Sequence, residues 1–227
     1  MIYDWTILLM LPGLILGLWA QFRVNRIYTS YLRKPTSHGI PAQELIQRLL
    51  AKQGVVDVYV SQTSGTLTDH FDPSTNTLRL SEGVYGSSSV AAIGIAAHEA
   101  GHALQKEEGY PWLNLRTALV PMVNISFHLS WPIFLVGYIF SFQPLIDIGI
   151  IVFALAVVFS LITLPVEFDA SRRANLMLSE SGYFSQEELN GVRRVLNAAA
   201  LTYVASFISI LLQFARLILI SRRSRRD

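Results

Sequence analysis

Four long apolar stretches stand out from the polar parts of the chain: Ile2–Phe22, Ala118–Phe142, Ile148–Val166 and Ala198–Ile220. Each approaches the ~20 apolar residues that a helix needs to cross the hydrocarbon core of a bilayer. Only the segment SFQPLID separates the second stretch from the third, so these two are predicted to form a helical hairpin. The pattern predicts about four transmembrane helices, with buried helices of a soluble protein as the alternative.

The first apolar stretch is predicted to be a retained membrane anchor. Signal peptides begin with positive charge and end with small residues at the cleavage site. Here Asp4 stands near the start, and bulky Trp19 directly precedes Ala20. Both features argue against cleavage.

The polar region between the first two apolar stretches has the pattern of a small α+β domain. PAQELIQRLLAKQG predicts a helix that begins at Pro41 and ends at Gly54. VVDVYV alternates as a strand does, and LTDHFDPSTNTLRLS predicts a hairpin with its turn at DPSTN. SSSVAAIGIAAHEAGHALQKEEG predicts a helix capped by serines and followed by Gly109. The expected fold class is therefore an α+β membrane protein, mostly helical, with a short β-sheet.

Composition supports the membrane assignment and excludes several functional classes. Apolar residues make up 52% of the chain and charged residues 15%, whereas soluble domains carry about 25% charged residues. A net charge of +2 gives no basis for nucleic-acid binding. The absence of cysteine excludes disulfides, thiolate metal ligands and cysteine nucleophiles.

The positions of lysine and arginine predict the topology. These residues gather at the membrane ends of two polar regions, 23–117 and 167–197, which the positive-inside rule places in the cytoplasm. The basic tail SRRSRRD conflicts with this placement if the fourth stretch crosses the membrane fully. Either the tail tolerates the outer side, or the fourth stretch lies partly in the interface and returns. We expect a multi-pass protein of the cell membrane, with the lipid bilayer as a partner.

Two histidines and a glutamate stand in the middle of the helix predicted around AAHEAGHALQ. His98 and His102 are four residues apart, so one face of the helix carries both, and their ring nitrogens can bind one Zn²⁺ ion. Glu99 points about a quarter of a circle away, where it can take a proton from a zinc-activated water. Because buried histidines without partners are costly, the apolar flanks favour a metal site over two ordinary surface residues.

A catalytic zinc ion needs a third protein ligand and one open position. His38, His70, His128 and downstream carboxylates are candidates. Glu167, in LPVEFDASRRA, is the best of them because it stands where the third apolar stretch ends, just after the helix-distorting Pro165. A simple carboxylate at the membrane edge is the alternative.

The motif HEAGHALQ, followed after a membrane hairpin by EFDASRRA, resembles the YugP-type zinc-dependent membrane proteases, which are neutral zinc metallopeptidases. It is more distantly similar to the HtpX and CAAX-prenyl gluzincins. The resemblance covers nearly the whole chain, including LTDHFDPSTNTLRLSEGVY upstream of the zinc helix. It implies one zinc ion per chain, bound by His98, His102 and Glu167, with Glu99 as the catalytic base.

The sequence departs from this pattern at one position. The HtpX-like pattern continues the third-ligand glutamate as E-x-x-x-D, where the aspartate orients a ligand histidine, but Ser171 stands at that place here. Asp169 or another group must therefore orient the histidine.

Substrate contacts are expected on the segment NTLRLS. It is predicted to present an edge strand beside the zinc helix, to which an extended peptide substrate could add through main-chain hydrogen bonds. A plain two-stranded hairpin is the alternative. The residues concerned are Asn76, Thr77, Leu78, Arg79 and Leu80.

Several other side chains are candidates for supporting roles. An oxyanion donor could come from His70, Tyr183, Arg172 or Arg173, each of which could equally be structural. Within the second apolar stretch, His128 could serve the site or hydrogen-bond a neighbouring helix together with Asn124. The zinc helix also carries small residues that predict close packing of the Glu167 helix: Ala96, Ala97, Ala100, Gly101 and Ala103.

These features predict five regions along the chain. They are a transmembrane anchor (1–22), a cytoplasmic catalytic domain (23–117), a transmembrane hairpin (118–166), a cytoplasmic helical segment with the third ligand (167–197), and a fourth membrane helix with a basic tail (198–227). The leading hypothesis is an integral membrane zinc endopeptidase that acts on membrane or misfolded proteins at the membrane–cytoplasm border. A catalytically silent scaffold or adaptor stabilised by zinc, and a transporter using His128 and Asn124, are the alternatives. The oligomeric state and any protein partner stay open.

Overall fold

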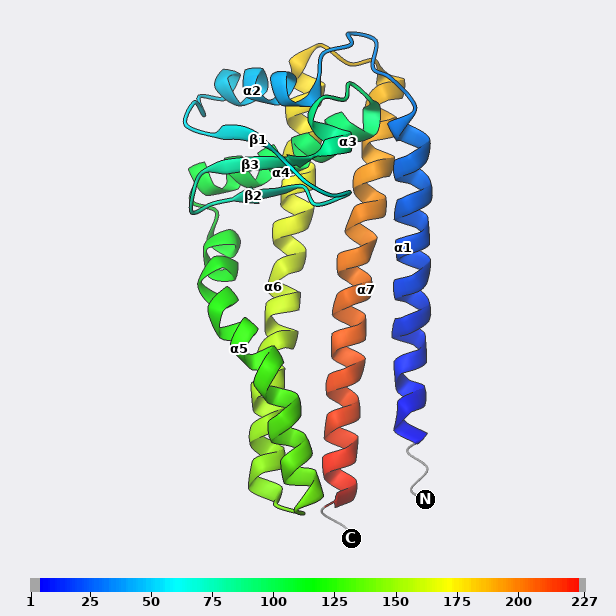
Figure 1. The fold of residues 1–227 in the computed structure, drawn as a ribbon, viewed down its shortest axis with the longest axis vertical. Helices are drawn as coiled ribbons and strands as arrows, with labels where there is room; N and C mark the ends of the chain where they lie inside the picture. The colour runs from blue at the N-terminus through cyan, green and yellow to red at the C-terminus, as the bar shows by residue number, and fades with distance from the viewer. Residues whose placement is uncertain (1–4, 225–227) are drawn as a thin grey trace. The chain divides into compact units, whose positions relative to one another are not determined.

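Long helices dominate the computed structural model, which describes residues 5–224. After a 3₁₀ turn, η1 (Trp5–Leu9), the long helices are α1 (Met10–Leu32), α5 (Pro111–Ile139), α6 (Gln143–Ser181) and α7 (Gln186–Ser224) (Figure 1). Four helices of the described chain are long and apolar enough to cross a membrane, as the sequence predicts. Asp4 and the last residues of the basic tail lie outside the described residues.

Each long helix extends beyond the apolar stretch that predicts it. α6 continues past Pro165 and Glu167 as far as Ser181. Apolar composition is required only where a helix meets lipid, whereas the helix itself continues until a residue breaks it. Gly182, with φ of +78°, follows directly and adopts the left-handed conformation that commonly ends a helix.

The chain forms two compact units. The first contains the chain up to Gln21, Asn114–Leu164 and the part from Thr202 onward. Within it α5 and α6 form the predicted hairpin. Their backbones approach so closely that a Cβ on Gly137 would lie 2.7 Å from the amide nitrogen of Ile146.

The second unit contains Phe22–Leu113 and Pro165–Leu201. Its three-stranded sheet consists of β1 (Tyr59–Thr63), β2 (His70–Asp72) and β3 (Thr77–Ser81). The strand order is β1-β3-β2, with β1 parallel and β2 antiparallel to β3, as Figure 1 shows. A core of buried aliphatic side chains from the sheet and helices fills this unit. Its shorter helices are α2 (Ala42–Lys52), α3 (Glu82–Tyr85) and α4 (Val90–Glu107).

The hairpin predicted around DPSTN is confirmed, with Asp72 opposite Thr77 across the turn. The Asp72 carboxylate accepts hydrogen bonds from the amide of Ser74 (2.9 Å) and the hydroxyl of Thr75 (2.7 Å). Asn76 then takes a positive φ of 53°. This is the local hydrogen bonding through which aspartate and asparagine favour turns.

The strand predicted over VVDVYV begins later than expected, at Tyr59. Val55 instead belongs to the end of α2, because its amide donates to Leu50 O at 2.9 Å while the Gly54 amide donates to Ala51 O at 3.0 Å. Gly54 has φ of +83°. Together these bonds form a Schellman cap, which holds Val55 in the core of this unit rather than in the sheet.

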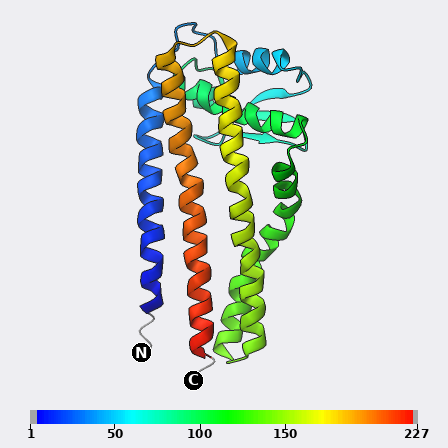
Figure 2. The same cartoon turned by 180° about the vertical axis from the view of Figure 1, so that it is seen from behind.

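Helix α4 lies at the centre of the second unit. Ser89 caps it by accepting a hydrogen bond from the amide of Ala92 at 3.2 Å, as the serines predict. It contacts α2, β2 and β3, and α6 passes directly against it at Gly101 (Figure 2). Because other elements of this unit surround α4, most of its side chains are buried and apolar. A polar side chain buried on α4 therefore needs a hydrogen-bond partner.

Candidate metal centre

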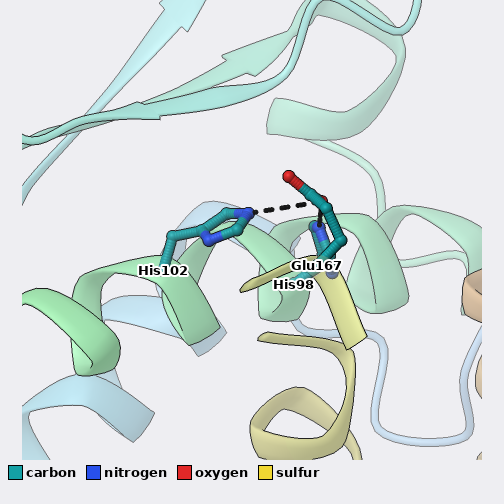
Figure 3. A group of neighbouring side chains, drawn as sticks. All are labelled: His98, His102 and Glu167. Atoms are coloured by element: carbon teal, nitrogen blue, oxygen red, sulfur yellow. Dashed lines mark hydrogen bonds and ion pairs between the residues drawn. The ribbon is translucent and has the colours of Figure 1, made fainter. Parts of the chain in front are cut away.

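Three potential ligand side chains converge within the second unit. His98 and His102 come from successive turns of α4, and Glu167 reaches them from α6 (Figure 3). Glu167 Oε2 lies 3.2 Å from His98 Nε2 and 3.6 Å from His102 Nε2. One potential ligand atom from each residue lies within 4.8 Å of the others. Glu167 is thus the candidate that the structure brings to the histidines.

The donor set and the local charge fit a zinc ion. Two imidazole nitrogens and one carboxylate oxygen are ligands that zinc commonly takes in proteins. Burial disfavours a charged His102, but hydrogen bonding to Glu167 and the negative charge of Glu99 outweigh it and raise the pKa of this imidazole. The carboxylates therefore favour positive charge at this point, which a divalent cation supplies.

Glu99 is buried beside the ligands, with only 8% of its surface exposed. Within residues 5–224, its carboxylate makes no hydrogen bond or ion pair. A buried carboxylate usually has such partners. Its oxygens are consequently available to accept a proton from a reacting group.

Both histidines are oriented through their second ring nitrogen. His98 Nδ1 lies 3.1 Å from the Ser171 hydroxyl, and His102 Nδ1 lies 2.9 Å from Gln105 Oε1. Ser171 lies four residues after Glu167, on the same face of α6. The prediction that Asp169 or another group orients the histidine is met by other groups, Ser171 and Gln105. Asp169 contacts Gln105 and not a histidine: its carboxylate accepts a hydrogen bond from Gln105 Nε2 at 3.0 Å.

The chain is similar to known proteins over nearly its whole length. Residues 6–222 match the model of a family described as "putative neutral zinc metallopeptidase". The chain belongs to this family. It is also 43% identical, over 96% of its own length and 97% of the other chain, to a Bacillus subtilis (strain 168) protein named "Putative membrane protease YugP". No solved structure matches the chain.

Membership of a zinc metallopeptidase family gives the cluster of His98, His102 and Glu167 a chemical context. The family match spans all three residues. A family of zinc peptidases implies zinc, and this cluster is the group of the described chain that could hold a metal ion.

The two ligand-bearing helices touch at a glycine. A Cβ on Gly101 would overlap the carbonyl oxygen of Ala170 and lie 3.0 Å from its carbonyl carbon. The predicted close packing of the Glu167 helix against the small residues of α4 is thereby confirmed. Ala170 lies between Glu167 and Ser171, so this contact sets the distance between the ligands.

We expect Gly101→Ala to destabilise the protein and lower its zinc content, because the added methyl group must push α6 away. Overpacking of this kind costs about 1–3 kcal/mol. Gly94→Ala on the same helix is the matched control, since its Cβ would lie at an ordinary 3.4 Å from Val192 Cγ1. Thermal unfolding and metal analysis of both variants test the prediction, which equal behaviour of the two would contradict.

The predicted edge strand is a central strand, so this prediction is wrong. β3, which contains Thr77, Leu78, Arg79 and Leu80, pairs with β1 on one side and β2 on the other. From Thr77 to Arg79 its main chain is paired on both sides, so this part of the strand offers no free edge to a substrate. Asn76 precedes the strand, and its side chain is held by the Asp57 carboxylate at 2.8 Å and by Lys106 at 2.8 Å.

The oxyanion candidates Tyr183, Arg172 and Arg173 contact residues other than the ligands. About 21 Å of helix axis separates Glu167 from Ser181, just before Tyr183, and that tyrosine ring contacts His38. Arg172 and Arg173 both bind Asp169, and Arg173 also pairs with Glu108. In the described structure, these three side chains therefore contact residues other than the metal-ligand candidates.

The three other histidines make local contacts. His38 Nδ1 accepts a hydrogen bond from the amide of Ile40 at 3.0 Å. His70 Nδ1 lies 2.8 Å from Thr68 O, and His128 Nδ1 lies 2.7 Å from Asn124 O on its own helix. Within the described residues, none of the three joins the metal cluster. His70 stays of interest because it begins β2, an edge strand.

Proposed function

We propose that the protein is an integral membrane zinc endopeptidase whose zinc ion is bound by His98, His102 and Glu167. The observation that carries the proposal is the convergence of these ligand atoms within 4.8 Å, from two helices. The buried Glu99 beside them adds the base that hydrolysis requires. Membership of the zinc metallopeptidase family supports the same conclusion.

In this proposal each side chain has a distinct chemical task. A bound zinc ion supplies an acidified water and a polarised substrate carbonyl. Glu99 accepts the proton of the attacking water and passes it to the leaving amine. The two ligand histidines are oriented by Ser171 and Gln105, so these ligands need little reorganisation.

The substrate we propose is an extended polypeptide that pairs with the free edge of β2. One side of β2 is paired with β3, and β2 contacts α4, the helix that carries the histidines. Main-chain pairing at a sheet edge accepts many sequences, which suits membrane proteins or misfolded segments. The name of the Bacillus subtilis relative, "Putative membrane protease YugP", supports a polypeptide as the substrate.

We further propose that the catalytic region faces the cytoplasm, with the five regions 1–22, 23–117, 118–166, 167–197 and 198–227 as inferred from the sequence. The distribution of lysine and arginine supports this orientation. α7 is one uninterrupted helix from Gln186 to Ser224. It offers no break at which the chain could turn back, which favours full crossing by the fourth stretch and an outer position of the basic tail.

Removal of zinc is expected to abolish peptide hydrolysis, and its return to restore it. The protein, purified in detergent, is depleted with a zinc chelator and assayed on an unfolded casein-type substrate, with zinc content measured in parallel. Loss of the zinc-dependent chemistry should lower the rate by at least about 100-fold. Full activity without metal would refute the proposal. Stoichiometric zinc with no hydrolysis of any polypeptide tested would favour the silent scaffold.

A further inference from the structure

The side chain of Gln105 is fully buried between the two helices that carry the ligands. It projects from α4, three residues after His102, and reaches α6. Its Nε2 donates to Val166 O at 2.8 Å and to Asp169 Oδ2 at 3.0 Å. Its Oε1 faces His102 Nδ1 at 2.9 Å. One amide therefore touches both a ligand histidine and the backbone directly before the ligand Glu167.

The surroundings of Gln105 determine which way its amide points. Val166 O and the Asp169 carboxylate can only accept hydrogen bonds, so the NH₂ group must face them. The carbonyl oxygen is then left facing His102, and it can only accept. His102 Nδ1 must consequently carry a proton, which leaves the lone pair of Nε2 free on the side of Glu167.

The hydrogen-bond partner of His98 does not determine the tautomer of its ring. The Ser171 hydroxyl beside its Nδ1 can either donate or accept. The hydrogen bond to Ser171 therefore places the ring without determining which nitrogen is protonated. Of the two histidines, His102 is the one whose tautomer the protein specifies by itself.

Asp169 is in turn held by charged partners. Arg172 Nε donates to its Oδ1 at 3.1 Å, and Arg173 binds its Oδ2. Arg173 also pairs with Glu108, at the end of α4, so the network joins both helices twice. An aspartate that faces two guanidinium groups remains an acceptor, which keeps the Gln105 amide from rotating.

We propose that Gln105 is a positioning residue for the metal centre, which fixes His102 in the tautomer that binds zinc through Nε2 and is itself oriented by Val166 O and Asp169. This inference rests on the proposed zinc site.

The test uses Gln105→Glu, which keeps the shape of the side chain but turns the amide nitrogen into an acceptor facing Val166 O and Asp169. Partners of this kind affect metal affinity by about 10–100-fold, and we expect zinc affinity to fall by that amount. Competition with a chromophoric chelator measures the affinity in detergent. The visible spectrum of the cobalt-substituted protein should also change, because it reports the ligand geometry. Gln47→Glu, at an exposed site on α2, makes the same chemical change and should alter neither.

A second variant separates orientation from general damage. Combining Gln105→Glu with Asp169→Asn exchanges donor and acceptor, so the asparagine NH₂ can donate to the introduced carboxylate. The double variant should recover part of the lost zinc affinity and of the cobalt spectrum. Should Gln105→Glu fail to fold, Asp169→Asn alone is expected to weaken zinc binding, because it presents an NH₂ group to the donors around it.

The outcomes distinguish this inference from the proposal on which it rests. Wild-type protein that binds no zinc would refute the zinc site, and the role of Gln105 with it. Zinc bound equally well by the wild type and by Gln105→Glu, with an unchanged cobalt spectrum, would overturn the role of Gln105 alone. A double variant weaker than both single variants would also overturn it.

Discussion

Glu99→Gln is expected to abolish peptide hydrolysis while zinc stays bound. Glutamine has the same shape but cannot accept a proton, and general bases contribute about 10²–10⁴-fold to rate. Glu99 is buried and has no hydrogen bond within the described chain that the substitution would break. Initial rates on a casein-type substrate and zinc content of the same preparations measure the two effects separately.

Glu107→Gln is the matched control, because it removes the same charge from an exposed site on the same helix. It should leave both rate and zinc content unchanged. If Glu99→Gln cleaves as fast as this control, Glu99 is not the base. If it loses zinc as well as activity, Glu99 contributes to the metal site rather than to proton transfer.

The features that the sequence predicted well are local ones. The spacing of His98 and His102 places both on one face of any helix, whatever the helix packs against. The cap at Ser89 and the turn after Asp72 likewise depend on hydrogen bonds within a few residues. Four apolar stretches predicted four long helices for the same reason, since their length and composition are read directly from the chain.

The order of the strands could not be predicted in the same way. Alternation shows that a segment is a strand, but it does not show which segments pair with it. β3 follows β2 through a tight turn and also pairs in parallel with β1, which comes from further back in the chain. Because of this second, nonlocal pairing, β3 is the central strand and not an edge strand. The edge strand that we propose to pair with a substrate is therefore β2.

The hydrogen-bond partners of the ligand histidines could be predicted from the sequence only in part. Ser171 and Gln105 depend on how α4 and α6 pack, which the sequence does not fix. A signal for Gln105 was nevertheless present, because it is a polar residue within an apolar helix, one turn after a ligand. A buried amide needs hydrogen-bond partners, and the nearest groups that need orienting are the ligand histidines.

Glu167→Ala is expected to reduce zinc affinity by at least about two orders of magnitude, because loss of even an indirect partner of a ligand costs 10–100-fold. Glu167 is the ligand candidate that α6 contributes, and only 2% of its surface is exposed. Without it, two imidazoles on α4 remain, and no carboxylate from α6 balances the charge of the ion. Zinc content after dialysis and the affinity from chelator competition measure the loss, and hydrolysis should disappear with it.

Glu180→Ala serves as the control, since it removes a carboxylate from an exposed position on the same helix. Its zinc content should match the wild type. Stoichiometric zinc in Glu167→Ala, with hydrolysis retained, would mean that the third ligand comes from elsewhere. In that event α6 would approach α4 at Gly101 for packing alone.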